Sequence, residues 1–236
     1  MLTTNCYATL AEAKARLGIS DTTDDAILKA VLENVSRAID GYCGRRFYVQ
    51  TATRYYTYDP AYDDLCVDDL LAVSFLYTDE DGDRTYETTW AATDYDLEPY
   101  NAPSESPPRP YTRLRQTPDG DYFFPAYLRG VKIVGSWGFY QVLESLDTLA
   151  AAITSLTATT LTATSGTLWS PGQTVLIDSE QMHVRSVSTN TVTVARGVNG
   201  TTAATHLNAA AVSVYTCPVI NEVCLLQVAR LFKRKD

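Results

Sequence analysis

The chain has 236 residues, 45% of them hydrophobic and 20% charged, with a formal net charge of −9 at pH 7. These values are typical of a soluble globular protein that is long enough for one or two domains. No run of about 18 apolar residues appears, which excludes a membrane-spanning helix. The N-terminus lacks the basic and apolar regions of a signal peptide, so we expect a protein made in a cytoplasm.

Two helices are predicted at the N-terminus. Thr9 and Glu12 have the spacing of a capping box, and Gly18 stands where a left-handed residue ends a helix. A second capping box at Thr22 predicts the start of a longer helix, whose apolar residues recur at helical intervals as far as Gly44.

The exit of the longer helix, GYCGRRF, concentrates unusual residue types. It lacks the pattern of a phosphate-binding loop and lies at the negative, C-terminal end of the helix. We interpret Cys43 as apolar filling. Arg45 and Arg46 either complement the helix dipole or pair with carboxylates at a subunit contact, and both interpretations stay open.

From Phe47 onward the sequence favours strands, with a hairpin around Asp81-Gly82 and an apolar strand, VKIVGSW, at residues 131–137. Prolines at 103–110 indicate an exposed loop. Between Asp59 and Glu98 there are thirteen acidic residues and one basic residue. That balance argues against tight phosphate binding, and the turn lacks the glycine and glutamate positions of an EF-hand loop.

Residues 141–215 are rich in threonine and valine, with turn residues between short alternating runs, which predicts a small β-sandwich or barrel. Pro218 then marks the first position of a C-terminal helix. Apolar residues cover a wide arc of that helix, so we expect it to be buried against the first helices or against another subunit.

The chain offers little material for catalysis. His183 and His206 are interpreted as polar strand and loop positions, and five widely spaced cysteines as reduced, mostly buried thiols. The sequence therefore predicts no catalytic residue, no cofactor and no metal site.

Four stretches resemble the head–tail connector proteins of tailed bacteriophages, also called adaptor or head-completion proteins. The longest covers residues 7–48, where a short capped helix precedes a longer one with a Cys-Gly-Arg-x-Phe exit. The others are TDYDLEPYN (93–101), RGVKIVGSWGFY (129–140) and CPVINEVCLLQVARLFKRK (217–235). In that family the middle strand runs almost directly into the last helix, so residues 141–215 resemble an insertion. Residues 177–206 are themselves similar to a small β unit that recurs in phage structural proteins.

The resemblance implies an α+β protein: a bundle of two N-terminal helices and one C-terminal helix, an antiparallel sheet, and an inserted all-β domain. The expected division is a connector core at 1–140, the insert at 141–215, and a returning helix at 216–236 that docks the portal.

The implied function is that of a structural virion protein and not an enzyme. It would form an adaptor ring of about twelve copies beneath the portal, extend the DNA channel, and give a platform to a stopper, tail-tube or tail-terminator protein. Double-stranded DNA would pass without tight binding, no membrane would be involved, and the ring would be assembled in the host cytoplasm into the neck of the virion.

Two sets of residues are expected to make these contacts. Portal or subunit contacts are predicted for Arg45, Arg46, Phe47, Leu226, Arg230, Phe232, Lys233, Arg234 and Lys235, and an acidic channel lining for Asp79, Glu80, Asp81 and Asp83. The alternatives are an accessory module that binds carbohydrate or a host surface through the insert, and a cell-wall hydrolase. The insert has few aromatic residues, which argues against the binding module. The chain has two histidines, which argues against the hydrolase.

Overall fold

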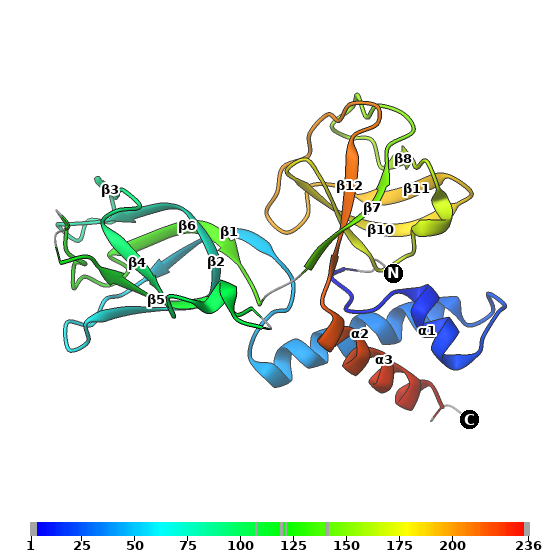
Figure 1. The fold of residues 1–236 in the computed structure, drawn as a ribbon, viewed down its shortest axis with the longest axis horizontal. Coiled ribbons are helices and arrows are strands. Elements are labelled where there is room, and N and C mark those ends of the chain that lie inside the picture. Colours follow the sequence, from blue (N-terminus) through cyan, green and yellow to red (C-terminus); the bar gives the residue numbers. More distant parts are fainter. Residues whose placement is uncertain (1–3, 107, 119, 121, 140–141, 234–236) are drawn as a thin grey trace. The chain divides into compact units, whose positions relative to one another are not determined.

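The computed structural model describes residues 4–106, 108–118, 120, 122–139 and 142–233. Within these residues the fold is α+β, as predicted, with three α-helices and two antiparallel sheets (Figure 1). The chain forms two compact units. Unit 1 combines residues 1–48 with 141–236, and unit 2 comprises residues 49–140. The helices thus share a unit with the second sheet, and the predicted division into connector core and insert stays a prediction.

The N-terminal helices of unit 1 follow their capping signals in part. Helix α1 (Leu10–Leu17) has the predicted capping box, with the Glu12 amide donating to Thr9 Oγ1 at 3.2 Å. Helix α2 (Asp25–Cys43) begins after Asp24, so the predicted start at Thr22 is wrong. The Asp25 amide donates to the Thr22 carbonyl at 3.3 Å, which places Thr22 in the preceding turn.

Helix α3 (Pro218–Phe232) packs on both N-terminal helices. Its inward face buries Cys224, Leu225 and Val228. The Cys224 Sγ lies 3.8 Å from the Ser36 Oγ of α2, which shows how closely the two helices approach. The three helices therefore form the predicted bundle.

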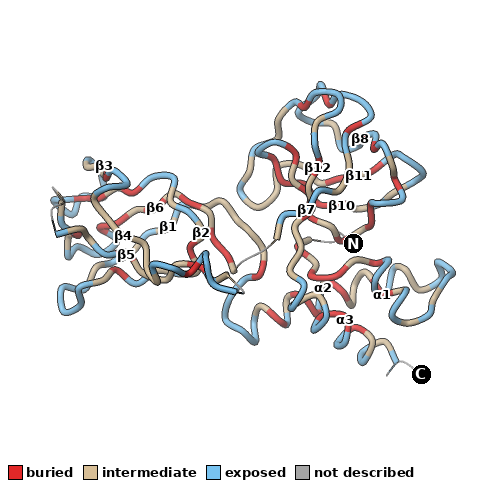
Figure 2. The backbone as a smooth tube through the Cα atoms, in the orientation of Figure 1, coloured by how far each residue is buried: buried red, intermediate tan, exposed pale blue. Residues whose placement is uncertain are grey.

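The sheet of unit 1 closes into a small barrel. Its strands follow the order β7-β12-β9-β10-β11-β8. Backbone hydrogen bonds, such as that from the Thr164 amide to the Thr148 carbonyl at 3.2 Å, join the ends of β7 and β8 and close the sheet. Buried residues fill the interior; they alternate with less buried ones along β11 and β12, whereas residues 180–184 of β10 are all buried (Figure 2). The strands are β7 (Val142–Thr148), β8 (Thr160–Thr162), β9 (Thr174–Ile177), β10 (Glu180–Ser188), β11 (Thr191–Ala195) and β12 (Ala211–Thr216).

Unit 2 is a bent antiparallel sheet of order β1-β6-β2-β5-β4, with β3 paired to β2. One face buries a core around Ile133, Trp137, Leu76 and Trp90. Gly135 is required in β6 because an added Cβ would lie 2.3 Å from the Ala72 carbonyl oxygen of β2. The strands are β1 (Gln50–Tyr56), β2 (Asp64–Thr78), β3 (Thr88–Trp90), β4 (Tyr95–Glu98), β5 (Tyr111–Gln116) and β6 (Val131–Trp137).

Candidate interface surfaces

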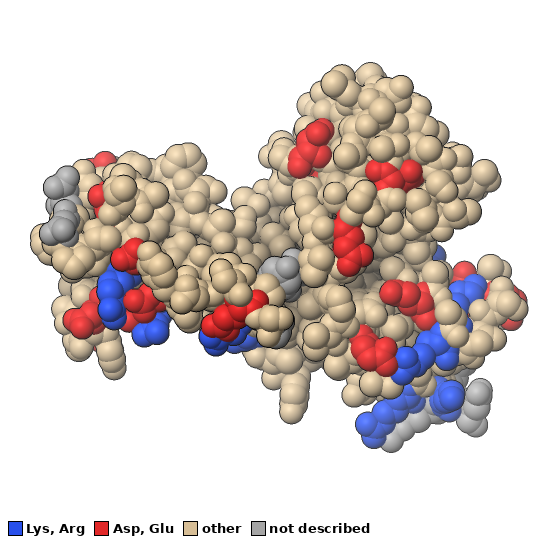
Figure 3. Space-filling view, in the orientation of Figure 1, with Lys and Arg blue, Asp and Glu red and all other residues tan. Residues whose placement is uncertain are grey.

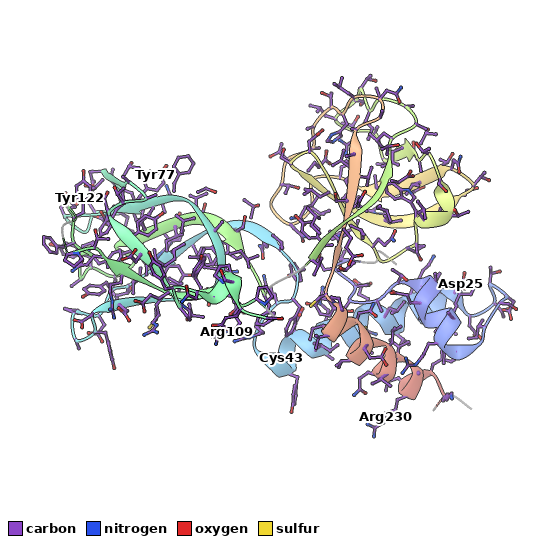
Figure 4. All side chains as sticks on the ribbon, in the orientation of Figure 1. Asp25, Cys43, Tyr77, Arg109, Tyr122 and Arg230 are labelled. Atoms are coloured by element: carbon purple, nitrogen blue, oxygen red, sulfur yellow. The ribbon has the colours of Figure 1, made fainter. Side chains whose placement is uncertain are left out.

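The end of α2 is exposed. Gly44 caps the helix in the left-handed conformation with φ 64°. Arg45 and Arg46 lie at the surface, and the Arg46 guanidinium lies 5.9 Å from the Tyr48 ring centre. Cys43 is exposed too (Figure 4), so its interpretation as apolar filling is wrong.

Phe47 does not lie at the surface where we predicted it. It is 6% exposed and packs edge-on against the Tyr7 ring, with the ring centres 5.8 Å apart. The Phe47 amide donates to the Tyr7 hydroxyl at 3.0 Å, and that hydroxyl donates to Asp40 of α2. Burial and the bond to Asp40 raise the pKa of Tyr7. Phe47 therefore fixes the chain to the end of α2 inside unit 1, and it is buried where we predicted a surface residue.

A row of apolar side chains on α3 faces away from the other helices. Val219, Val223 and Leu226 are 69%, 41% and 50% exposed, and their spacing places them on one face of the helix, in line with Arg230. We call these four residues the α3 outer row. Leu226 therefore lies at the surface, whereas Phe232 is half-buried.

The C-terminal end of α3 is basic. Arg230 and Lys233 are exposed, and Arg230 projects away from the helix (Figure 4). Blue side chains gather at this end in the space-filling view (Figure 3). Arg234 and Lys235, which we also predicted at an interface, lie outside the described residues.

The turn between β2 and β3, residues 79–87, carries the carboxylates that we predicted to line a channel. Asp79 is buried and accepts the backbone amides of Gly82 and Arg84, each at 2.7 Å. Asp79 therefore orders the loop from within and is buried, where we predicted an exposed carboxylate. Glu80, Asp81 and Asp83 are exposed. We call residues 79–87 the acidic loop.

Four carboxylates of the acidic loop could hold a cation. Their nearest oxygens lie within 4.8 Å of one another, and the residues are Asp79, Asp81, Asp83 and Glu87. Both Asp79 oxygens already accept amides, and the bond from the Thr85 amide lowers the pKa of Asp83. Backbone amides therefore stabilise the negative charges of Asp79 and Asp83.

A cavity of about 380 Å³ lies in unit 1 between the N-terminal segment, the barrel and the start of α3. Its lining includes Cys6, Glu12, Glu144, Thr174 and Cys217. Burial raises the pKa of Cys6 to about 12 and also raises that of Cys217. Both thiols are therefore held protonated and are poor nucleophiles at neutral pH.

The barrel holds a buried polar network that the sequence did not indicate. The Glu180 carboxylate accepts Arg196 Nε at 2.6 Å, Arg196 Nη2 at 2.7 Å and the Ala204 amide at 2.9 Å. His206 Nε2 lies 2.9 Å from Glu180, and His206 Nδ1 lies 2.7 Å from Asp178. Burial by itself would raise the pKa of Glu180. The hydrogen bonds to its carboxylate outweigh this effect and lower the pKa of Glu180 to about 2.

Both histidines are consequently structural. The two ring nitrogens of His206 are occupied by carboxylates, so neither can act as a base toward a nucleophile. His183 is 4% exposed, its Nδ1 lies 3.0 Å from the Thr174 hydroxyl, and burial lowers its pKa to about 4. His183 lies on a strand and His206 in a loop, as predicted, and both side chains are buried.

Unit 2 has an aromatic surface that our sequence reading missed. Tyr55 of β1 and Tyr77 of β2 flank Lys132 of β6 in register, on the face opposite the core. The alternation of Phe75 and Tyr77 in SFLYT is a signal that could have indicated it.

Residues 7–66 match the family model described as phage gp6-like head-tail connector protein. None of the curated proteins and none of the solved structures matches the chain. The matched segment contains α1, α2, β1 and the first residues of β2, and its part up to residue 48 is the longest stretch that carried the resemblance in the sequence. Residues 7–66 are thus similar to the phage gp6-like head-tail connector proteins, the family that the sequence resembles.

Proposed function

We propose that the chain is the subunit of an adaptor ring in the neck of a tailed phage. The ring attaches beneath the portal, extends the DNA channel and gives a platform to the stopper or tail protein. The connector match over residues 7–66 supports a place in the neck. The proposal includes about twelve copies that close head to tail, assembly in the host cytoplasm, and no catalytic step.

The α3 outer row is the observation that carries this proposal. One face of α3 is buried in the helical bundle, yet Val219, Val223 and Leu226 remain exposed on another face. Contiguous exposed apolar side chains are typical of protein interaction sites. A helix with two apolar faces is expected in a protein that buries the second face of that helix when it assembles.

The charge at the end of α3 is consistent with an acidic partner. Arg230 continues the apolar row, and Lys233 lies one turn away. Basic residues at a helix C-terminus complement its dipole, and arginine pairs well with carboxylates. We therefore assign the α3 outer row and Lys233 to the portal contact.

Changing the α3 outer row tests the portal contact. The Leu226→Asp variant should lose co-sedimentation with purified portal, and phage that carry it should accumulate filled heads without tails. Gln227→Asp is the matched control, since Gln227 is the exposed neighbour on the same helix and outside the row. Circular dichroism of both variants checks that the helices persist. Normal attachment by a folded Leu226→Asp variant would contradict the proposed contact.

The charge of the chain supports passage of DNA without tight binding. The net charge is −9, and thirteen acidic residues lie between Asp59 and Glu98 with one basic residue. Like charges repel the phosphate backbone. The purified chain should leave duplex DNA unretarded in a gel at physiological salt, and a clear shift would count against this part of the proposal.

No membrane is part of the proposed role. Among the described helices, none combines the length and the apolar character that crossing a membrane requires. Carbohydrate binding by the barrel finds little support in its two aromatic residues, since Trp169 is 4% exposed and Tyr215 is half-buried.

A further inference from the structure

The uncovered face of the unit 2 sheet carries an aromatic and cationic patch. Cross-strand register places Tyr55, Lys132 and Tyr77 in one row, and Val134 and Phe75 in the next. Tyr55 is 42% and Phe75 53% exposed. We define the tyrosine face by Tyr55, Phe75, Tyr77, Arg129 and Lys132; Tyr86 of the acidic loop packs against its edge.

The rings and cations of this face hold one another in place. Tyr55 packs against Tyr86 with ring centres 5.7 Å apart, and Phe75 stacks on Tyr77 at 5.9 Å. The Arg129 guanidinium lies 4.6 Å from the Tyr55 ring centre, and Lys132 Nζ lies 4.8 Å from that of Tyr77. Tyr77 projects from the sheet (Figure 4). The face is therefore ordered before any partner arrives, which reduces the entropy cost of binding.

The cations of the tyrosine face differ from Arg54 and Arg115, two other cations of unit 2. Arg54 lies 2.8 Å from Asp68, and Arg115 lies 2.7 Å from Asp64. Within the part of the chain that the structure describes, Arg129 and Lys132 instead contact rings and have no carboxylate within 4 Å. Aromatic residues and arginine are enriched at the centres of protein interfaces. An ordered aromatic face with two unneutralised cations is complementary to an acidic protein surface.

The acidic loop of unit 2 has the matching chemistry. Glu80, Asp81 and Asp83 are exposed, and Asp79 orders the loop through the Gly82 and Arg84 amides. In one copy, Tyr86 anchors the end of this loop to its own tyrosine face, yet the loop carboxylates do not reach Lys132 or Arg129 within 4 Å. The two surfaces can satisfy each other between copies.

We propose that the acidic loop of a second copy docks on the tyrosine face, with its carboxylates against Arg129 and Lys132. Each copy then offers one surface to a neighbour and the other surface to the next neighbour. Such a head-to-tail contact closes a ring when the rotation is favourable. The inference rests on the proposed ring function and assigns it a subunit contact that lies outside the matched residues.

Cysteine cross-linking in assembled particles tests this contact. Two full-length versions of the chain are co-expressed during phage infection. Both carry Cys43→Ser and Cys66→Ser, which remove the two exposed thiols of the described residues. One version carries Lys132→Cys. The other carries Asp81→Cys and a short mass tag, and a short bismaleimide links thiols that touch. In the control pair, Asp63→Cys replaces Asp81→Cys, because Asp63 is an exposed acid elsewhere in unit 2.

The proposal predicts at least about tenfold more mixed cross-linked dimer for the Lys132–Asp81 pair than for the Lys132–Asp63 pair, because a docked neighbour raises the effective concentration of the thiols. Particles that contain both versions but give equal yields for the two pairs would overturn the inference and leave the ring function standing. Absence of the wild-type chain from particles would instead contradict the proposed function. A charge exchange supplies a second readout: Lys132→Glu should lower incorporation into particles, and adding Asp81→Lys should restore it.

Discussion

The carboxylate of Glu180 and the guanidinium of Arg196 form a bidentate ion pair inside the barrel, with N–O distances of 2.6 and 2.7 Å. The Glu180 side chain is fully buried and that of Arg196 is 6% exposed. Glu180 also accepts the amides of Gly197 and Ala204. One carboxylate thus fixes the loop between β11 and β12, which lacks regular structure of its own.

Removing the charge of Glu180 should destabilise the protein strongly. Glu180→Gln leaves the Arg196 guanidinium buried without its counter-ion, so we expect a loss of about 3–5 kcal/mol in the free energy of unfolding. Urea denaturation followed by fluorescence measures this loss. Asp178→Asn is the control, because Asp178 is 64% exposed and its exchange should cost about 1 kcal/mol or less. Equal losses in the two variants would contradict the importance of the buried pair.

Stability should fall in acid in two stages. Burial lowers the pKa of His183 from 6.5 to about 4, so between these pH values the unfolded chain binds a proton that the folded chain does not, and stability decreases as the pH falls. The pKa of Glu180 is lowered from 4.5 to about 2, so its contribution is lost as the pH falls through that lower range.

The His183→Gln variant separates these stages. Its urea midpoint should change less than that of the wild type between pH 6.5 and pH 4, and should fall in parallel with it below pH 4. Midpoints measured across this series check both expectations. An unchanged slope between pH 6.5 and 4 would show that His183 is not the titrating group.

The Tyr7 hydroxyl should contribute to the stability of unit 1. Tyr7→Phe removes the acceptor of the buried Phe47 amide and the donor to Asp40, at an expected cost of about 1–3 kcal/mol. Tyr42→Phe, at a residue that is 94% exposed on α2, should change stability by less than about 0.5 kcal/mol. Thermal melts of the two variants compare them directly, and equal melting temperatures would refute the role of the hydroxyl.

The barrel should be removable from the chain. Thr216 pairs with Val142, so the two ends of residues 142–216 lie side by side and a short Gly-Ser linker can replace the segment. We expect the shortened chain to melt cooperatively, at a lower temperature because contacts such as Leu10 amide to Pro171 carbonyl at 3.1 Å are lost. Calorimetry measures this, and loss of a cooperative transition would show that the helices depend on the barrel for folding.

Local signals predicted much of the fold. The Thr9–Glu12 box, Gly18 and Pro218 depend on residues a few positions apart, and each marks a helix end as expected. Strand β7, in contrast, was not predicted, because the run VLESLDT does not alternate clearly and becomes a strand only by pairing with β12, far along the chain.

The exposure of the residues predicted at interfaces could be predicted only in part, because burial depends on contacts that are distant in the sequence. Leu226 and Arg230 lie at the surface, whereas Phe47 is covered by Tyr7, forty residues away. Asp79 looks like its exposed acidic neighbours in sequence, yet it is buried under amides of its own loop. The tyrosine face needs three strands in register, which no single stretch of sequence reveals.

Cryo-electron microscopy of the neck in phage that carry this chain is the most direct measurement. The proposed function predicts a closed ring of copies directly beneath the portal, with α3 of each copy against the portal. A neck that is complete without this chain, or copies located elsewhere in the particle, would contradict it.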